Sequence, residues 1–319
     1  DGGDDEFNGR CEVNGNNNVA AYGSKVLGYN SIAHFYSVCL GGGNNMAAMN
    51  SLAFGSGCKA YGNSVAIGEG CSAGTKYTGG PDPSRVPPST SIGSMEEAGN
   101  GGCCFAFGRS ITLIGNESIA VGYDIDASGR FDHGIIVGLG LKATNQSECA
   151  IFGRYNQYES LGIAGIPLLI VGNGVHNTGS ITRSNALVLD DNGNLYISGA
   201  YNSPGADYAE RYKWINGHNV IENEGLFVTI DGTKIRLANE DDDYILGVIS
   251  TNPAFIGNDG EEGTPIGMFG QLIVVDDGSC EVNGYCRPRN GGIATKTFDR
   301  SCYRVIQRVD ESHIKIIFR

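Results

Sequence analysis

The chain has 319 residues, of which 50 are glycine and 9 are proline, and only 18% are charged, so it is neither a disordered acidic tail nor a coiled coil. Frequent glycine disfavours helices, because each helical glycine costs about 1 kcal/mol relative to alanine. The net charge of -13 argues against nucleic-acid binding, and no apolar run approaches the roughly 18 residues of a membrane-spanning helix. The composition predicts an all-β protein with many turns and a sizeable core.

A short pattern recurs in the first part of the chain: a small polar residue is followed by an apolar, a small and an apolar residue, and then by glycine. The three closest copies are Asn50–Gly55, Asn63–Gly68 and Glu117–Gly122. Looser copies are Ser37–Gly41, Cys104–Gly108, Gly134–Gly138, Cys149–Gly153 and Leu168–Gly172. So short a period cannot form a domain alone, but it can form one coil of a parallel β-solenoid.

Side chains alternate between the two faces of a strand, which assigns the residues of each copy to two ladders. In one copy, Val65 and Ile67 lie on one face, whereas Ser64 and Ala66 lie on the other. Stacked coils then build an apolar ladder beside a ladder of small residues. We expect the apolar ladder to be buried, so that aspartate at Ile67 would place an unpaired charge in the core.

Several cysteines occupy small-residue positions of this pattern. Cys39 takes the alanine position, and Cys104 and Cys149 take the serine position, so each is expected to pack as a small residue. Cys58 and Cys71 are 13 residues apart and should stack on adjacent coils. Such a pair can be a disulfide or an ordinary small-residue ladder, and the sequence leaves both open.

Glycine becomes rarer after the repeats, which predicts two architectures. Residues 1–180 are expected to form the solenoid, with a proline-rich insertion at 75–91 that should protrude as a loop. Residues 181–202 are expected to form a β-hairpin connector around an Asp-Asn-Gly turn. Residues 203–319 should form a compact, non-repetitive β domain, a normal size for one core.

The coil with the sequence Asn63-Ser-Val-Ala-Ile-Gly68 resembles the head repeat of YadA-like trimeric adhesins, over roughly residues 18–175. The resemblance implies a left-handed parallel β-roll in which three chains associate side by side as a homotrimer. It leaves open whether the roll binds a host-surface receptor or a glycan. The heptads of the stalk that usually follows in that family do not occur here.

Three motifs of the last third resemble, in this order, the peptidase G2 domain: Ser203–Glu210 (SPGADYAE), Phe227–Gly232 (FVTIDG) and Asp243–Pro253 (DYILGVISTNP). That domain is the self-cleaving C-terminal intramolecular chaperone of phage neck appendages and related spikes, and the resemblance covers residues 203–319. It implies that three copies assemble and align the β-structure before them. It also implies that the chain is then cut once, and by position the bond would be the one between Asn202 and Ser203.

The residues around this bond suit the chemistry. The Ser203 hydroxyl can attack the carbonyl of Asn202 if another group accepts its proton, and Pro204 restricts Ser203 to an extended conformation. Asp207 and Glu210 would share a face in a helical turn, where one carboxylate could accept the proton and the other donate one, in either order. Alternatively, the segment is only a helix start, with Ser203 or Asp207 as its cap.

Other groupings point to no cofactor or metal. The histidines are scattered without a metal-binding motif, and Asp241–Asp243 is expected to be a solvated loop. Cys280, Cys286 and Cys302 could meet as a metal or redox cluster or remain free thiols. No paired carboxylates occur within the repeats, which argues against a polysaccharide-degrading tailspike.

These observations lead to one hypothesis and one alternative. The hypothesis is a viral or phage fibre or appendage protein, at a virion or extracellular surface, whose last domain promotes trimerisation and acts as a single-turnover self-cleaving peptidase. The alternative is a bacterial surface trimeric adhesin whose last domain is a non-cleaving trimerisation cap. Only the hypothesis predicts a cut at one defined bond.

Overall fold

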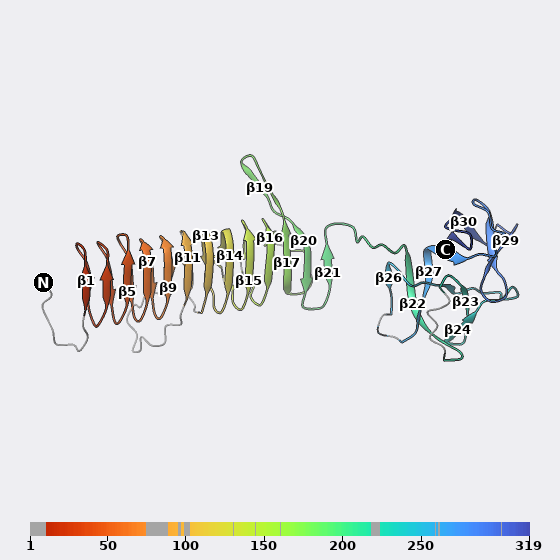
Figure 1. Ribbon diagram of the computed structural model, residues 1–319, viewed down its shortest axis with the longest axis horizontal. Helices are drawn as coiled ribbons and strands as arrows, with labels where there is room; N and C mark the ends of the chain where they lie inside the picture. The colour runs from red at the N-terminus through yellow and green to blue at the C-terminus, as the bar shows by residue number, and fades with distance from the viewer. Residues whose placement is uncertain are drawn as a thin grey trace. The chain divides into compact units, whose positions relative to one another are not determined.

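The chain divides into two units, Asp1–Ala200 and Tyr201–Arg319. The computed structural model describes residues 11–74, 89–94, 97–98, 103–129, 131–143, 145–159, 161–217, 224–258, 260, 262–300 and 302–319. The all-β prediction is confirmed, because the first unit is a parallel β-solenoid and the second is a mixed β-sheet (Figure 1). Within the described part, no helix has the length and hydropathy that crossing a membrane would need.

The solenoid consists of two parallel ladders, each with a strand from successive coils. The longer ladder contains β1 (Glu12–Asn14), β3 (Lys25–Leu27), β5 (Val38–Gly41), β7 (Leu52–Ser56), β9 (Val65–Glu69), β11 (Thr90–Ser94), β13 (Phe105–Leu113), β14 (Ile119–Ala127), β15 (Ile135–Leu139), β16 (Ala150–Arg154) and β17 (Pro167–Asn173). The shorter ladder contains β2 (Val19–Ala20), β4 (Ile32–His34), β6 (Met46–Ala48), β8 (Lys59–Tyr61), β10 (Ser72–Ala73) and β12 (Glu97–Ala98), which pairs with the second half of β13.

The repeated glycines stack on one another because their backbones approach too closely for a side chain. Gly122 pairs with Gly138 of the next coil, and a Cβ on Gly122 would collide with the Gly138 carbonyl oxygen. Its φ of 143° is also one that residues with a side chain rarely adopt. The glycine that ends each copy of the pattern is therefore required by coil stacking.

The two ladders of side chains exist as predicted, but the expectation that the apolar ladder is buried is wrong. Ala66 and Ser64 point into the solenoid and are almost fully buried, whereas Val65 and Ile67 lie on the outer face and are only partly covered. The interior of a thin coil is narrow, and in the first coils it is filled mainly by alanine and cysteine. The bulkier residues are consequently on the outside.

Serines of successive coils form a buried hydrogen-bonded ladder. The Ser64 hydroxyl accepts from the Ser89 amide at 2.9 Å, and the Ser51 hydroxyl accepts from the Ser64 amide at 3.2 Å. The Cys104 amide donates in the same way to Ser89, which confirms the serine position predicted for Cys104. A cysteine there keeps the packing but supplies a weaker acceptor.

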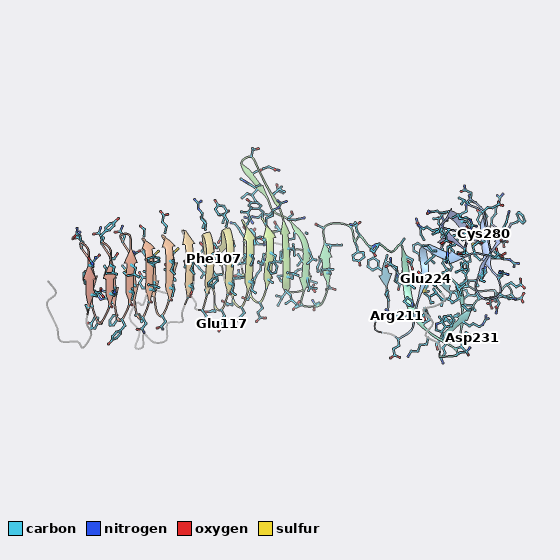
Figure 2. All side chains as sticks on the ribbon, viewed as in Figure 1. Phe107, Glu117, Arg211, Glu224, Asp231 and Cys280 are labelled. Atoms are coloured by element: carbon cyan, nitrogen blue, oxygen red, sulfur yellow. The ribbon has the colours of Figure 1, made fainter. Side chains whose placement is uncertain are left out.

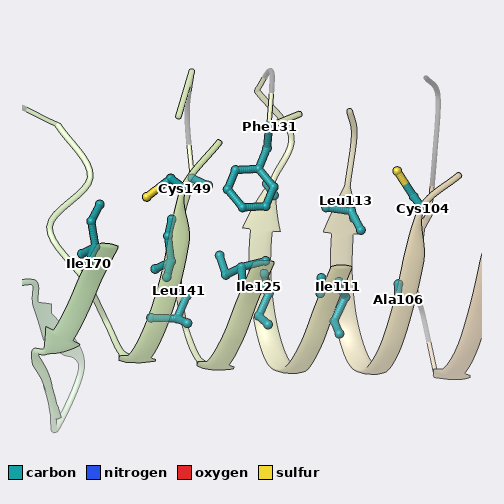
Figure 3. Packing of buried hydrophobic residues seen from close by; sticks show 14 of the residues in the cluster. Cys104, Ala106, Ile111, Leu113, Ile125, Phe131, Leu141, Cys149 and Ile170 are labelled. Atoms are coloured by element: carbon teal, nitrogen blue, oxygen red, sulfur yellow. The ribbon is translucent and has the colours of Figure 1, made fainter. Parts of the chain in front are cut away.

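The interior widens toward the end of the solenoid. A cluster that runs along the axis from Cys104 to Ile170 contains larger side chains, among them Leu113, Phe131 and Leu141 (Figure 3). Cys58 and Cys71 belong to the narrower first cluster and are free thiols, as are Cys39 and Cys149.

The proline-rich insertion does not interrupt coil stacking. Residues 75–88 of the expected loop lie outside the described residues, but β9 and β11 pair in register on either side of it, with Ala66 opposite Ser91. Thr90 and Ser91 begin β11, so the last residues of the expected loop belong to a strand instead.

The last parallel strand is covered by antiparallel strands. β20 (Asn185–Asp190) pairs with β17, and β21 (Leu195–Ile197) pairs with β20. β20 thus pairs with the backbone groups at the free edge of β17, which would otherwise be open to a strand of another chain. Between β17 and β20, the hairpin of β18 (Val175–Asn177) and β19 (Ser180–Thr182) projects from the solenoid (Figure 1).

The second unit is a ten-stranded mixed sheet in the order β26-β22-β24-β23-β25-β27-β31-β30-β28-β29. Its strands are β22 (Asp207–Trp214), β23 (Phe227–Asp231), β24 (Lys234–Leu237), β25 (Gly247–Ile249), β26 (Phe255–Ile256), β27 (Thr264–Val275), β28 (Tyr285–Pro288), β29 (Ala294–Thr297), β30 (Tyr303–Arg308) and β31 (His313–Phe318). The first strand, β22, pairs antiparallel with the long β27 and parallel with the short β26, and this arrangement positions the candidate site.

Candidate active site

The segment before β22 is held against the loop that precedes β26. Gly205 packs so closely on the backbone of Asn252 and Pro253 that a Cβ would collide with it. The Ala254 amide donates to the Asp207 carbonyl at 2.8 Å. The predicted cleavage bond therefore lies at the start of a chain segment that the second unit holds in place.

Ser203 is half-buried in this segment, and its hydroxyl accepts a hydrogen bond from the Gly205 amide at 3.3 Å. Two residues earlier, the Tyr201 ring packs on the Phe255 ring with centroids 4.6 Å apart. Residues on both sides of the predicted bond thus contact the same short strand and its loop.

Asp207 is the first residue of β22, and its side chain is buried inside the unit. It is 6% exposed, and its Oδ2 atom has no hydrogen-bond partner among the described residues. Burial raises the pKa of the Asp207 carboxyl, and a hydrogen bond with Ser250 offsets part of the rise. A buried carboxyl with a raised pKa and an unpaired oxygen is suited to holding and delivering a proton.

The Asp207 carboxyl occupies space that is free because Gly267 of β27 has no side chain. A Cβ at Gly267 would lie 2.6 Å from Asp207 Oδ2 and would also collide with Leu272. Any larger residue at this position would displace the carboxyl. Gly267 is far from Asp207 in the sequence, and no local motif marked it.

Glu210 lies in a different environment. Its Oε1 accepts a hydrogen bond from the Tyr208 hydroxyl at 2.9 Å, and its Oε2 accepts one from the Tyr212 hydroxyl at 3.0 Å. The hydrogen bond with Glu210 raises the pKa of Tyr208, and burial together with Glu210 raises the pKa of Tyr212 to about 12. Both oxygens of this half-buried carboxylate are therefore held in a fixed orientation.

The helical turn expected at this site is wrong, because Asp207–Trp214 is a strand. In a strand, residues three apart point to opposite faces, so Asp207 and Glu210 do not share a face within one chain. The pairing of Tyr208 and Tyr212 with Glu210 shows the alternation directly. Neither Ser203 nor Asp207 caps a helix.

The described residues contain one group of side chains that could hold a metal ion: Asp276, Asp277 and Cys280. Arg308 contacts Asp276 Oδ2 at 2.6 Å, and Arg289 contacts Asp277 at 3.5 Å. These arginines already neutralise the carboxylates, so the group has the character of an ion-pair network in the sheet. Cys280 is buried beside Cys286, and both are free thiols.

Comparison with known families identifies part of the chain. Residues 171–261 match the model of Peptidase_G2, the IMC autoproteolytic cleavage domain. The matched segment begins within β17 and contains Ser203, Asp207 and Glu210, so the resemblance to peptidase G2 is confirmed for this segment. The bounds differ from the expected 203–319. No curated protein matches the chain significantly.

Two solved structures, both from bacteriophage phi29, are similar to the chain. The C-terminal fragment of gene product 12 is 17% identical over 35% of this chain and 100% of that one, with a TM-score of 0.29. The pre-mature gene product 12 is 13% identical over 94% of this chain and 39% of that one, with a TM-score of 0.46. At such TM-scores the superpositions do not establish a common fold. The YadA-like identity of the repeats stays a prediction.

Proposed function

We propose that the protein is a phage appendage or fibre protein whose second unit promotes assembly into a homotrimer and cuts its own chain once, between Asn202 and Ser203. The match of residues 171–261 to an autoproteolytic cleavage domain carries this proposal. The buried carboxyl of Asp207, close in sequence to the predicted bond, supports it. Such a protein belongs to the virion, at a surface where it meets its host.

Self-cleavage can be written with residues of the chain and water alone. The Ser203 Oγ adds to the carbonyl carbon of Asn202 while a carboxylate takes its proton. The bond from that carbon to the Ser203 nitrogen breaks as the nitrogen takes a proton from a second carboxyl, leaving an ester. Water then hydrolyses the ester, which gives a carboxylate at Asn202 and a free amine at Ser203.

An exposed apolar stripe on the solenoid supports association with other copies. The outward residues of the longer ladder include Phe54, Phe107 and Ile135, which are 47%, 50% and 42% exposed in the single chain. Figure 2 labels Phe107 on the solenoid. Phe54 and Phe107 lie in one row of the ladder, which runs between them through Ile67 and Ile92. Ile135 lies in the neighbouring row, opposite Ile119. Continuous apolar surface of this kind usually marks an interface between proteins, and side-by-side copies in the same orientation would cover it.

The test is the mass of the fragments from the purified full-length chain. We expect the wild-type protein to yield a fragment that begins at Ser203, without added protease. Ser203→Ala should remain full length, because the attacking hydroxyl is gone. A wild-type chain that stays intact for days would refute self-cleavage and favour a non-cleaving trimerisation cap. Cutting of Ser203→Ala at the wild-type rate would assign the attack to water instead.

A further inference from the structure

The two candidate carboxyl groups lie on opposite faces of β22. Residues 208, 210 and 212 share one face, since Tyr208 and Tyr212 both donate to Glu210. Asp207 and Ala209 lie on the other face and are buried. A strand rises about 3.3 Å per residue, so Glu210 is also about 10 Å further along the strand than Asp207. One chain therefore does not present both groups to one peptide bond.

Asp207 cannot leave its own unit without disrupting it. Its carboxyl lies against Gly267 of β27 and hydrogen-bonds to Ser250, both in the same unit. The strand that carries it is paired on both sides, with β26 and with β27. A neighbouring chain therefore cannot approach the Asp207 carboxyl without opening this pairing.

Glu210, by contrast, is accessible from outside its unit. Its side chain is only partly buried, and Tyr208, which shares its face, is 39% exposed. The hydroxyls of Tyr208 and Tyr212, two residues before and two residues after Glu210, hold the two oxygens of its carboxylate. The carboxylate is still only partly buried. A segment of another chain could approach this face.

We propose that the cleavage site is shared between copies, with Ser203 and Asp207 supplied by one chain and Glu210 by its neighbour. The inference rests on the proposed self-cleavage. The neighbour's Glu210 takes the proton from the Ser203 Oγ as that oxygen bonds to the carbonyl carbon of Asn202. Asp207 delivers its proton to the nitrogen that leaves. The cut then waits for assembly, because a single chain lacks one of the two proton carriers.

Mixed assemblies test this division of roles. Chains with Glu210→Gln and chains with Ser203→Ala, each with its own affinity tag, are co-expressed and purified through both tags. Neither variant alone should be cut at more than about one hundredth of the wild-type rate. In equal mixtures of trimers that carry both tags, about two thirds of the Glu210→Gln chains should be cut, because each site uses one neighbour in a cyclic assembly. Asp207→Asn mixed with Ser203→Ala is the matched control and should stay uncut.

Each other result would overturn the inference. If Glu210→Gln chains remain uncut in the mixtures, Glu210 acts within its own chain. If they are cut at the wild-type rate without a partner, Glu210 carries no proton. If wild-type chains are cut without forming any assembly, no neighbour is involved. Failure of the wild type itself to cut would refute the proposed function, and cutting of Asp207→Asn chains would refute the role of Asp207.

Discussion

The buried carboxyl of Asp207 lowers the stability of the fold and, at the same time, has the raised pKa that suits a proton donor. Its Oδ2 has no hydrogen-bond partner among the described residues, and an unsatisfied buried polar group is costly to a fold. Proteins keep such costs mostly where function needs them. The raised pKa of this carboxyl means that the folded chain binds its proton more tightly than the unfolded chain does.

This proton linkage predicts how stability depends on pH. Because the pKa of Asp207 is raised above 3.8 in the folded state, stability should fall as the pH rises from about 3.8 through the raised value. Asp207→Asn, which needs no proton, should therefore unfold at a higher temperature than its parent at neutral pH. The gap should close in acid. Thermal unfolding of both chains in a Ser203→Ala background, across pH 3 to 8, measures the effect.

Asp242 provides the control of opposite sign. The hydrogen bond from Arg236 lowers the pKa of Asp242, so its contribution to stability is present at neutral pH and is lost as the pH falls below 3.8. Asp242→Asn should unfold at a lower temperature at neutral pH, with the difference closing in acid. If Asp207→Asn behaves like Asp242→Asn, the carboxyl of Asp207 is paired and ionised.

At the scale of elements, the thin coil determines which side chains are inside. A five-residue strand such as β9 offers alternate residues to the interior, which is filled mainly by alanine and cysteine, with serines of successive coils buried beside them. The larger residues of the same strand remain on the outer face. In these coils the small residues of the pattern are therefore buried, and the larger apolar residues lie on the outer face.

Neighbouring substitutions in β9 separate folding from assembly. Ala66→Asp places an unpaired charge in the interior and should cost on the order of 3–5 kcal/mol, which unfolds the coil. Ile67→Asp should leave the coil folded, because Ile67 lies on the outer face, but should weaken association. Lys59→Asp, at the exposed first residue of β8, is the control and should change neither. Circular dichroism melts and light scattering distinguish the three, and equal melts for Ala66→Asp and Lys59→Asp would contradict this face assignment.

At the scale of the whole molecule, the outer apolar stripe, the covered end of the solenoid and the shared site all concern assembly. β20 closes the parallel ladder at its last strand, so strand addition there is blocked and copies are left to meet through their faces.

Association should therefore precede cleavage. We expect light scattering at micromolar concentration to give the mass of three chains for Ser203→Ala. Phe107→Asp, whose side chain is half-exposed between Ile92 and Val121 of adjacent coils, should dissociate this assembly into single chains. In a chain with intact Ser203, the same change should slow the cut. A stable single chain for Ser203→Ala, or an unslowed cut in dissociated Phe107→Asp, would contradict the order of events.

The repeats could be predicted from the sequence because their information is local. Asn63–Gly68 contains the strand residues, the alternation of small and larger side chains and the glycine that coil stacking requires. Copies of this segment recur along the first unit, once in each coil of the longer ladder. The ordered motifs beginning at Ser203 were enough to point to a self-cleaving domain and to the residues that could act in it. The identity of the small-residue positions, such as Cys104 in the serine ladder, followed from the same periodicity.

The tertiary structure decided what depends on contacts between distant parts of the chain. The interior of the first coils holds mainly alanine and cysteine, so Ala66 lies inside and the larger Ile67 lies outside. Pairing with β27 made a strand of Asp207–Trp214, where the local spacing of carboxylates had favoured a helical turn. That pairing brought Gly267 beneath Asp207 and turned Glu210 to the other face, and no residue near Ser203 in the sequence carries this information.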